Sequence, residues 1–129
     1  MGFSTFDERT AQNWQIVFND TSYPTPSPFA PPDVRVSRFD TIIGTNNDTV
    51  DHTLGAYFDF GAGPVHFATV TLQAGAGEPG TPSVDVLDAL IPATSPGIVL
   101  AAGSELGFAQ YEALGSGKLI RIVAIGGYC

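Results

Sequence analysis

The chain contains few cysteines and no long apolar run. Cys129 is the only cysteine among the 129 residues, so an intrachain disulfide and a multi-cysteine metal site are both excluded. No uninterrupted apolar stretch approaches the roughly 20 residues that a membrane helix requires. The first nine residues lack a basic region followed by an apolar core, so we expect no signal peptide and synthesis in a cytoplasm.

Basic residues are also scarce. Five lysines and arginines face 13 aspartates and glutamates, which gives a formal net charge of −8. The basic residues are Arg9, Arg35, Arg38, Lys118 and Arg121, and they form no cluster in the sequence. Nucleic acids and anionic lipid surfaces require several cations on one face. We therefore expect neither nucleic acid nor a membrane as a partner.

The apolar content is high enough for a folded core. Hydrophobic residues make up 43% of the chain and charged residues 14%, and such a composition argues against disorder. The length corresponds to one domain. We expect an N-terminal strand plus a proline-rich arm over residues 1–33 and a β-sandwich domain over 34–129.

The proposed arm contains half of the prolines. Five of the ten prolines lie between residues 19 and 33, and proline's fixed φ and missing N–H predict an extended, polyproline-like segment. An arm that carries aromatic side chains requires a neighbouring surface on which to lie. We expect an assembly interface here, formed by Trp14, Tyr23, Pro24, Pro26, Pro28 and Phe29.

Short alternating segments predict an all-β fold. Trp14, Ile16 and Phe18 alternate with Asn13, Gln15 and Val17, which is typical of a half-buried strand. Similar patterns occur over residues 34–43, 49–60, 65–72, 98–100, 105–113 and 118–125. The last pattern is apolar on both faces, so we expect this strand to be central in its sheet. The pattern predicts a β-sandwich or jelly-roll-like barrel of about seven or eight strands.

Two turns and one helix punctuate these strands. Residues 44–48 and 61–64 have the glycine, asparagine and proline content of turns, and the second turn predicts a hairpin. Leu54, Ala56, Phe58 and Phe60 are expected to share one face of the strand before this turn. Thr81 followed by Pro82 predicts the start of a short helix over residues 82–91.

Residues 75–80 match the dinucleotide fingerprint Gly-x-Gly-x-x-Gly between a predicted strand and a predicted helix. In a true site the helix starts within the glycines, so that its free N–H groups face the pyrophosphate. Pro79 and Pro82 delay the helix and remove donors. We therefore interpret this segment as a loop rather than a nucleotide site.

Two groups of side chains raise the question of metal binding. His52 and His66 could approach each other on paired strands with Asp51 or Asp59 nearby, which would suit zinc or iron, but their spacing is not a metal motif and favours structural histidines. The oxygen-rich segment 46–51 could ligate calcium, yet it lacks the EF-hand pattern and suits a turn. We expect no metal and no other cofactor.

The sequence contains no recognisable catalytic motif. Ser116 lies in Gly-Ser-Gly rather than in a nucleophile motif, and a hairpin turn explains it. The carboxylate pairs Glu105 with Glu112 and Asp85 with Asp88 could be posed as glycosidase acids, but exposed surface charge is the favoured interpretation. We predict no catalytic residue and no enzymatic activity.

Several short blocks resemble one family. They cover residues 43–46, 70–77, 80–82, 84–87, 100–103 with Leu106, 116–118 and 122–128. In this order, over about two-thirds of the chain, they look like small virion proteins of tailed bacteriophages. The resemblance implies a β-rich, non-enzymatic, oligomeric protein that binds capsid or tail surfaces.

From the resemblance we expect a head decoration or cement protein, made in the host cytoplasm and located in the virion. Its partners would be the major capsid protein or other virion proteins, and a homo-oligomer, with a trimer favoured. A tail- or fibre-associated protein is the alternative in the same class. From another class, the domain could be a carbohydrate-binding module that stacks sugars on Trp14, Tyr57 or Tyr111, and a third reading is a metalloenzyme that uses His52 and His66.

Overall fold

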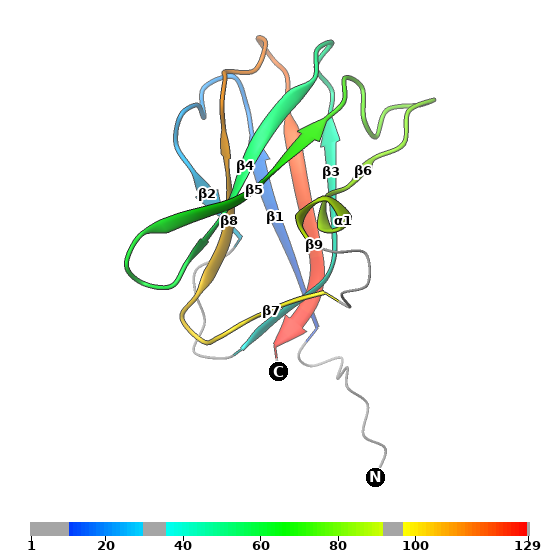
Figure 1. The fold of residues 1–129 in the computed structure, drawn as a ribbon. Coiled ribbons are helices and arrows are strands. Elements are labelled where there is room, and N and C mark those ends of the chain that lie inside the picture. Colours follow the sequence, from blue (N-terminus) through cyan, green and yellow to red (C-terminus); the bar gives the residue numbers. More distant parts are fainter. Residues whose placement is uncertain (1–10, 30–35, 92–96, 129) are drawn as a thin grey trace.

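Two antiparallel sheets pack face to face (Figure 1). The computed structural model describes residues 11–29, 36–91 and 97–128. The elements are β1 (Ala11–Phe18), β2 (Ser27–Pro28), β3 (Ser37–Asn46), β4 (His52–Asp59), β5 (Pro64–Leu72), β6 (Val84–Asp85), α1 (Val86–Leu90), β7 (Ile98–Leu100), β8 (Glu105–Gln110) and β9 (Ile120–Tyr128). The expected all-β sandwich with one short helix is confirmed.

The strand order is that of a jelly roll. The first sheet runs β1-β9-β3-β6, with β7 also paired to β3, and the second runs β2-β8-β4-β5. Strands β6 and β7 pair with opposite ends of β3 and therefore occupy one position of the sheet, interrupted by α1. Eight strand positions in this order form two sheets that cover one core.

Side-chain alternation determines which face of each strand lies inside. Trp14, Ile16 and Phe18 of β1 are buried, whereas the intervening Gln15 and Val17 are exposed. Strand β9 pairs with β1 on one side and β3 on the other, so its predicted central position is confirmed. Its inward residues Ile120 and Ile122 are fully buried, and they meet the side chains of the second sheet in one core.

The N-terminal residues belong to the sandwich rather than to a separate arm. Strand β1 pairs with β9, and β2 pairs with β8, so both sheets require them. Phe29 is 3% exposed and packs edge-on against Phe108. Among the described residues, β1 and β2 thus pair with strands that lie after residue 33. Residues 30–33 of the predicted arm lie outside the described residues.

The β4–β5 hairpin forms as predicted, with a difference at its tip. Gly61 and Gly63 adopt positive φ in the turn, a conformation that glycine tolerates best. Leu54 and Ala56 are buried, but Phe60 is 63% exposed. Phe60 lies outside the strand, because β4 ends at Asp59. Phe60 stacks on Phe58 instead.

The helix is shorter than the sequence suggests. Helix α1 begins at Val86, and its N-cap is Asp85, whose carboxylate accepts a hydrogen bond from the Asp88 N–H. The predicted start at Pro82 with a Thr81 cap is wrong, because Val84 and Asp85 pair with β3 as a strand. In the described part of the chain, no helix has the length and apolar character needed to cross a membrane.

The burial of Trp14 leads to a stability prediction. We expect Trp14→Ala to lower the free energy of unfolding by about 3–5 kcal/mol, because it leaves a large cavity between β1 and the rest of the core. Val17→Ala, on the exposed face of the same strand, should cost no more than about 1 kcal/mol. Urea unfolding followed by circular dichroism measures both. Equal, small losses would contradict a core position for Trp14.

Candidate functional site

A buried carboxylate connects two loops at one end of the sandwich. Asp48 is 6% exposed. Its oxygens accept hydrogen bonds from the N–H groups of Thr49 at 2.7 Å and Gly115 at 3.0 Å. The Gly115 N–H and then the His52 ring lower the pKa of Asp48 to about 2, against the opposing effect of burial. Asp48 therefore stays ionised and holds the 47–51 loop to the 111–119 loop.

His52 lies between two carboxylates. Its Nε2 is 2.8 Å from Asp48 Oδ2, and its Nδ1 is 3.4 Å from Glu112 Oε1. Both ring nitrogens can donate at the same time only in the imidazolium form. His52 is 3% exposed, so a substrate has little access to it. The geometry gives Asp48, His52 and Glu112 a structural role.

The oxygen-rich segment 46–51 is a hydrogen-bonded turn, as predicted. Asn46 is fully buried, and its Nδ2 donates to the carbonyls of Val50 and Leu72, both at 3.0 Å. Its Oδ1 accepts from the Asp48 N–H at 2.9 Å, and Asp51 Oδ1 accepts from the Ala74 N–H at 2.8 Å. The oxygens considered as calcium ligands thus bind backbone donors.

The two histidines of the metal hypothesis lie apart. In the register of β4 and β5, His52 pairs with Leu72 and faces the core side, whereas His66 pairs with Tyr57 and is exposed. They lie on opposite faces of the sheet, so the approach of the two rings that the metal alternative required does not occur. Among the described residues, no group of three or more His, Cys, Asp or Glu side chains could hold a metal ion.

The outer face of the second sheet carries a cluster of rings. Tyr57 and His66 are neighbours, with ring centroids 5.9 Å apart. A Cβ at Gly107 would overlap the Tyr57 hydroxyl, and a Cβ at Gly55 would lie 2.8 Å from the hydroxyl of Tyr111. The two glycines therefore make room for aromatic rings on the sheet. Tyr111 is 53% exposed, whereas Tyr57 is 5% exposed.

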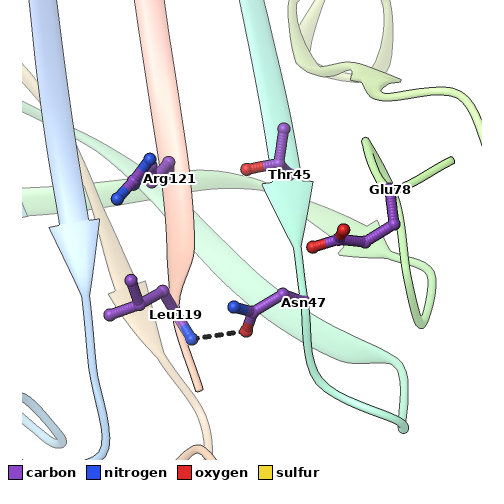
Figure 2. Close-up of a pocket in the computed structure, with 5 residues that line it drawn as sticks. All are labelled: Thr45, Asn47, Glu78, Leu119 and Arg121. Atoms are coloured by element: carbon purple, nitrogen blue, oxygen red, sulfur yellow. Dashed lines mark hydrogen bonds between the residues drawn. The ribbon is translucent and has the colours of Figure 1, made fainter. Parts of the chain in front are cut away.

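The glycine-rich segment 75–80 is a loop, as interpreted from the sequence. Its Gly75 N–H donates to the Asp48 carbonyl, and its Ala76 carbonyl accepts from the Asn46 N–H at 2.9 Å. A Cβ at Gly77 would lie 2.6 Å from Thr45 Cγ2, so the loop packs closely on β3. Between them lies a small polar pocket of about 130 Å³, lined by Thr45, Asn47, Glu78, Leu119 and Arg121 (Figure 2).

The residues expected to form the assembly interface divide into two groups. Trp14 and Phe29 are in the core, so neither can contact a partner's surface in this fold, and Trp14 cannot stack on a sugar. Tyr23 is 44% exposed, Pro24 and Pro26 are exposed, and Pro28 is half-buried. The spacing of Trp14, Ile16 and Phe18 at every second residue was the sequence signal for the burial of Trp14.

A hollow lies beside the exposed members of this group. It measures about 280 Å³ and is lined by Val17, Phe18, Thr21, Ser22, Thr25, Pro26 and Ser27. These residues come from the end of β1 and from its connection to β2, including the start of β2. The sequence has prolines and a tyrosine in the connection between β1 and β2. It did not predict that this connection packs against its own domain.

The remaining candidate groups have local structural roles or lie on the surface. Ser116 lies in a turn in which the Lys118 N–H donates to the Gly115 carbonyl at 3.0 Å. Asp85 caps α1, and Asp88 and Glu112 are exposed. The turn expected at Ser116 and the surface positions expected at Asp88 and Glu112 agree with the geometry.

The comparisons with known proteins leave the site to be judged from its geometry. No protein-family model matches the chain, and neither a curated protein nor a solved structure matches it. A jelly-roll sandwich hosts many unrelated functions, so the fold alone assigns none.

The low pKa of Asp48 leads to a prediction about acid stability. The folded-state pKa of about 2 lies below the ordinary value of 3.8, so Asp48 stabilises the fold above about pH 4 and loses this effect as the pH falls towards 2. We expect Asp48→Asn to lower the free energy of unfolding by about 2–3 kcal/mol at pH 7. The variant should also show a shallower decline between pH 4 and pH 2, measured by urea unfolding at each pH. Parallel pH curves for the two proteins would contradict this role.

Proposed function

We propose that this chain is a non-enzymatic structural protein of a tailed-bacteriophage virion. In this proposal it is a head decoration or cement protein that binds the capsid surface and stabilises the particle. The tail or a fibre is the alternative location in the same virion. The family resemblance of the sequence motivates the class, and the geometry of the β1–β2 connection supports binding by surface contact.

One observation carries the proposal: the β1–β2 connection is firmly held yet presents apolar groups to solvent. The Thr25 N–H donates to the Ser22 carbonyl at 2.9 Å. The Ser22 hydroxyl donates to Gln110 Oε1 at 2.7 Å, which ties the connection to β8. Tyr23, Pro24 and Pro26 are nevertheless exposed beside the hollow. We call Tyr23, Pro24 and Pro26 the apolar ridge.

A ridge that is already ordered is well suited to binding. Association costs free energy for each side chain and loop that must be immobilised, and preorganisation lowers that cost. Tyrosine is enriched among the residues that dominate binding energy, because it supplies a large contact area and a polar hydroxyl. The apolar ridge therefore combines a low entropic cost with a suitable anchor.

The polar groups of the domain are compatible with a non-catalytic role. Among the described residues, the buried Asp48 and His52 bind each other, and Asp48 also binds the loop backbone. In the described part of the chain, these hydrogen bonds occupy the buried carboxylate and imidazole that acid–base catalysis would otherwise need. The acidic net charge also fits a protein that binds other proteins rather than nucleic acid.

The proposal is tested on virions produced by the genome that encodes this chain. Mass spectrometry of purified particles should detect the chain at a stoichiometric level. Particles made without its gene should then rebind the purified protein, and Tyr23→Ala should weaken rebinding by about 30-fold, the effect of losing about 2 kcal/mol. Deleting residues 19–33 would be a poor test, since it removes β2 and Phe29 from the fold.

Phe60→Ala is the matched control, because Phe60 is another exposed aromatic residue, on the β4–β5 hairpin tip. It should rebind like the unmodified protein. Absence of the chain from purified particles would overturn the proposed function. Rebinding that is insensitive to Tyr23 would overturn the role of the apolar ridge.

A second candidate is a carbohydrate-binding module, favoured by the ring cluster on the second sheet. Tyr111 and His66 lie over Gly55, and Thr53, Thr69 and Thr71 supply hydroxyls on the same face. Burial, and then the carboxylates of Glu105 and Asp59, raise the pKa of Tyr57. Because these carboxylates lie beside the rings, the cluster suits a neutral sugar better than an anionic one.

Affinity electrophoresis in gels that contain neutral polysaccharides tests this candidate. We expect retardation of the unmodified protein and its loss in Tyr111→Ala, because sugar rings stack on exposed aromatic faces. Tyr23→Ala, which removes an exposed tyrosine elsewhere, is the control and should be retarded normally. Retardation that both variants retain would contradict a sugar site at Tyr111.

A further inference from the structure

The outer face of the first sheet is partly apolar. Across β1, β9 and β3, three of the outward rows are Asn13–Ile125–Thr41, Gln15–Val123–Ile43 and Val17–Arg121–Thr45, and the next row along the strands contains Arg38, which pairs with Asp40. Val17 is 42% exposed and Ile125 is 45% exposed, while Val123 and Ile43 are half-buried. A sheet face with four apolar side chains near its centre is a typical contact surface.

Two opposite charges flank the pocket at the end of this face. Figure 2 shows Arg121 and Glu78 on opposite sides of the pocket, with Thr45 and Asn47 between them. Within the described part of the chain, neither the Arg121 guanidinium nor the Glu78 carboxylate makes a hydrogen bond or an ion pair. Asn47 is oriented by its own bond, since its Oδ1 accepts from the Leu119 N–H at 2.7 Å.

The charge distribution of the face differs from that of the whole chain. The net charge is −8, yet the three rows contain Arg121 as their only charged residue. Asp85 continues the middle row at the β6 edge, where its carboxylate caps α1. Two copies of this acidic chain would therefore repel each other least when these faces meet.

The pocket is too small to be a usual ligand site. Its volume of about 130 Å³ lies below the range of roughly 300–1,000 Å³ that is typical of small-molecule sites. A side chain from another protein surface fits such a space better. Its lining offers a guanidinium, a hydroxyl and an amide as donors, and one carboxylate as acceptor.

We propose that the outer face of the first sheet binds a second copy of this chain, with Arg121 of each copy paired to Glu78 of the other. A two-fold interface requires a surface that is complementary to itself, so that each contact occurs twice. A donor and an acceptor on opposite sides of one pocket, both without an ion pair to any described residue, meet this requirement. A two-fold axis near Thr45 and Asn47 places each charge opposite its partner.

This two-fold contact is a separate inference from the apolar ridge. It uses β1, β9, β3 and the 75–80 loop, whereas the ridge lies on the connection from β1 to β2. It does not rest on the proposed function, because the purified chain is sufficient for the test. A dimer formed in this way can also be the unit from which a larger assembly is built.

Charge reversal tests the pairing. Sedimentation equilibrium should show a reversible dimer for the unmodified chain, and Arg121→Glu and Glu78→Arg should each raise its dissociation constant by about 100-fold, because each creates two like-charged contacts. The double variant Arg121→Glu with Glu78→Arg should restore the dimer to within about tenfold, because it re-forms both pairs with reversed polarity.

Two controls make the result decisive. Asp88→Arg changes the net charge as much as Glu78→Arg does, at an exposed position on α1, and it should leave dimerisation unchanged. Circular dichroism should show the same fold for every variant. A monomeric unmodified chain at millimolar concentration, a double variant that stays monomeric, or an equal effect of Asp88→Arg would each overturn the proposal.

Discussion

The pairing of β9 with both β1 and β3 is the constraint on which the fold depends. Strand β9 is the last described strand and β1 is the first, so the first sheet forms only when segments about 100 residues apart in the sequence meet. Long-range pairing of this kind costs loop-closure entropy before stabilising contacts form. The burial of Ile120, Ile122 and Ala124 against side chains of both sheets offsets this cost.

This constraint explains why the N-terminal prolines do not form an arm over the described residues. Once β1 lies beside β9, the chain must cross to the second sheet to reach β8, and the connection between them is short. Prolines and turn residues suit that crossing, because fixed φ values lower the entropy lost on folding. Phe29 then enters the core, while Tyr23, Pro24 and Pro26 remain outside. The same composition thus serves the fold and leaves an apolar ridge on its surface.

The polar groups of the domain are used to stiffen its loops. Asn46, Asp48 and His52 are buried, and their side chains bind loop backbone and one another. A buried carboxylate is tolerated because several N–H donors surround it. Three surfaces of different character remain: an apolar ridge, a ring cluster on the second sheet, and a partly apolar face on the first sheet, with two charges that form no ion pair with a described residue.

Local patterns in the sequence were sufficient to predict most strands. Alternation at Trp14, Ile16 and Phe18, the glycine turn at 61–64 and the two apolar faces of β9 each depend on neighbours along the chain, so the sequence alone determined the all-β class, the hairpin and the central strand. It also determined the absence of an intrachain disulfide and the acidic charge. The start of α1 was misjudged, because the extent of β6 depends on its pairing with β3.

Only the tertiary structure decided which distant residues meet. Asp48 joins Gly115 across 67 positions of the sequence, and Ser22 joins Gln110 across 88. The face that each histidine occupies depends on strand register, which a single-residue shift reverses. Arg121 and Glu78 line one pocket because the 75–80 loop folds over β3. No local pattern encodes such contacts, since their energy comes from groups that become neighbours only when both sheets close over the core.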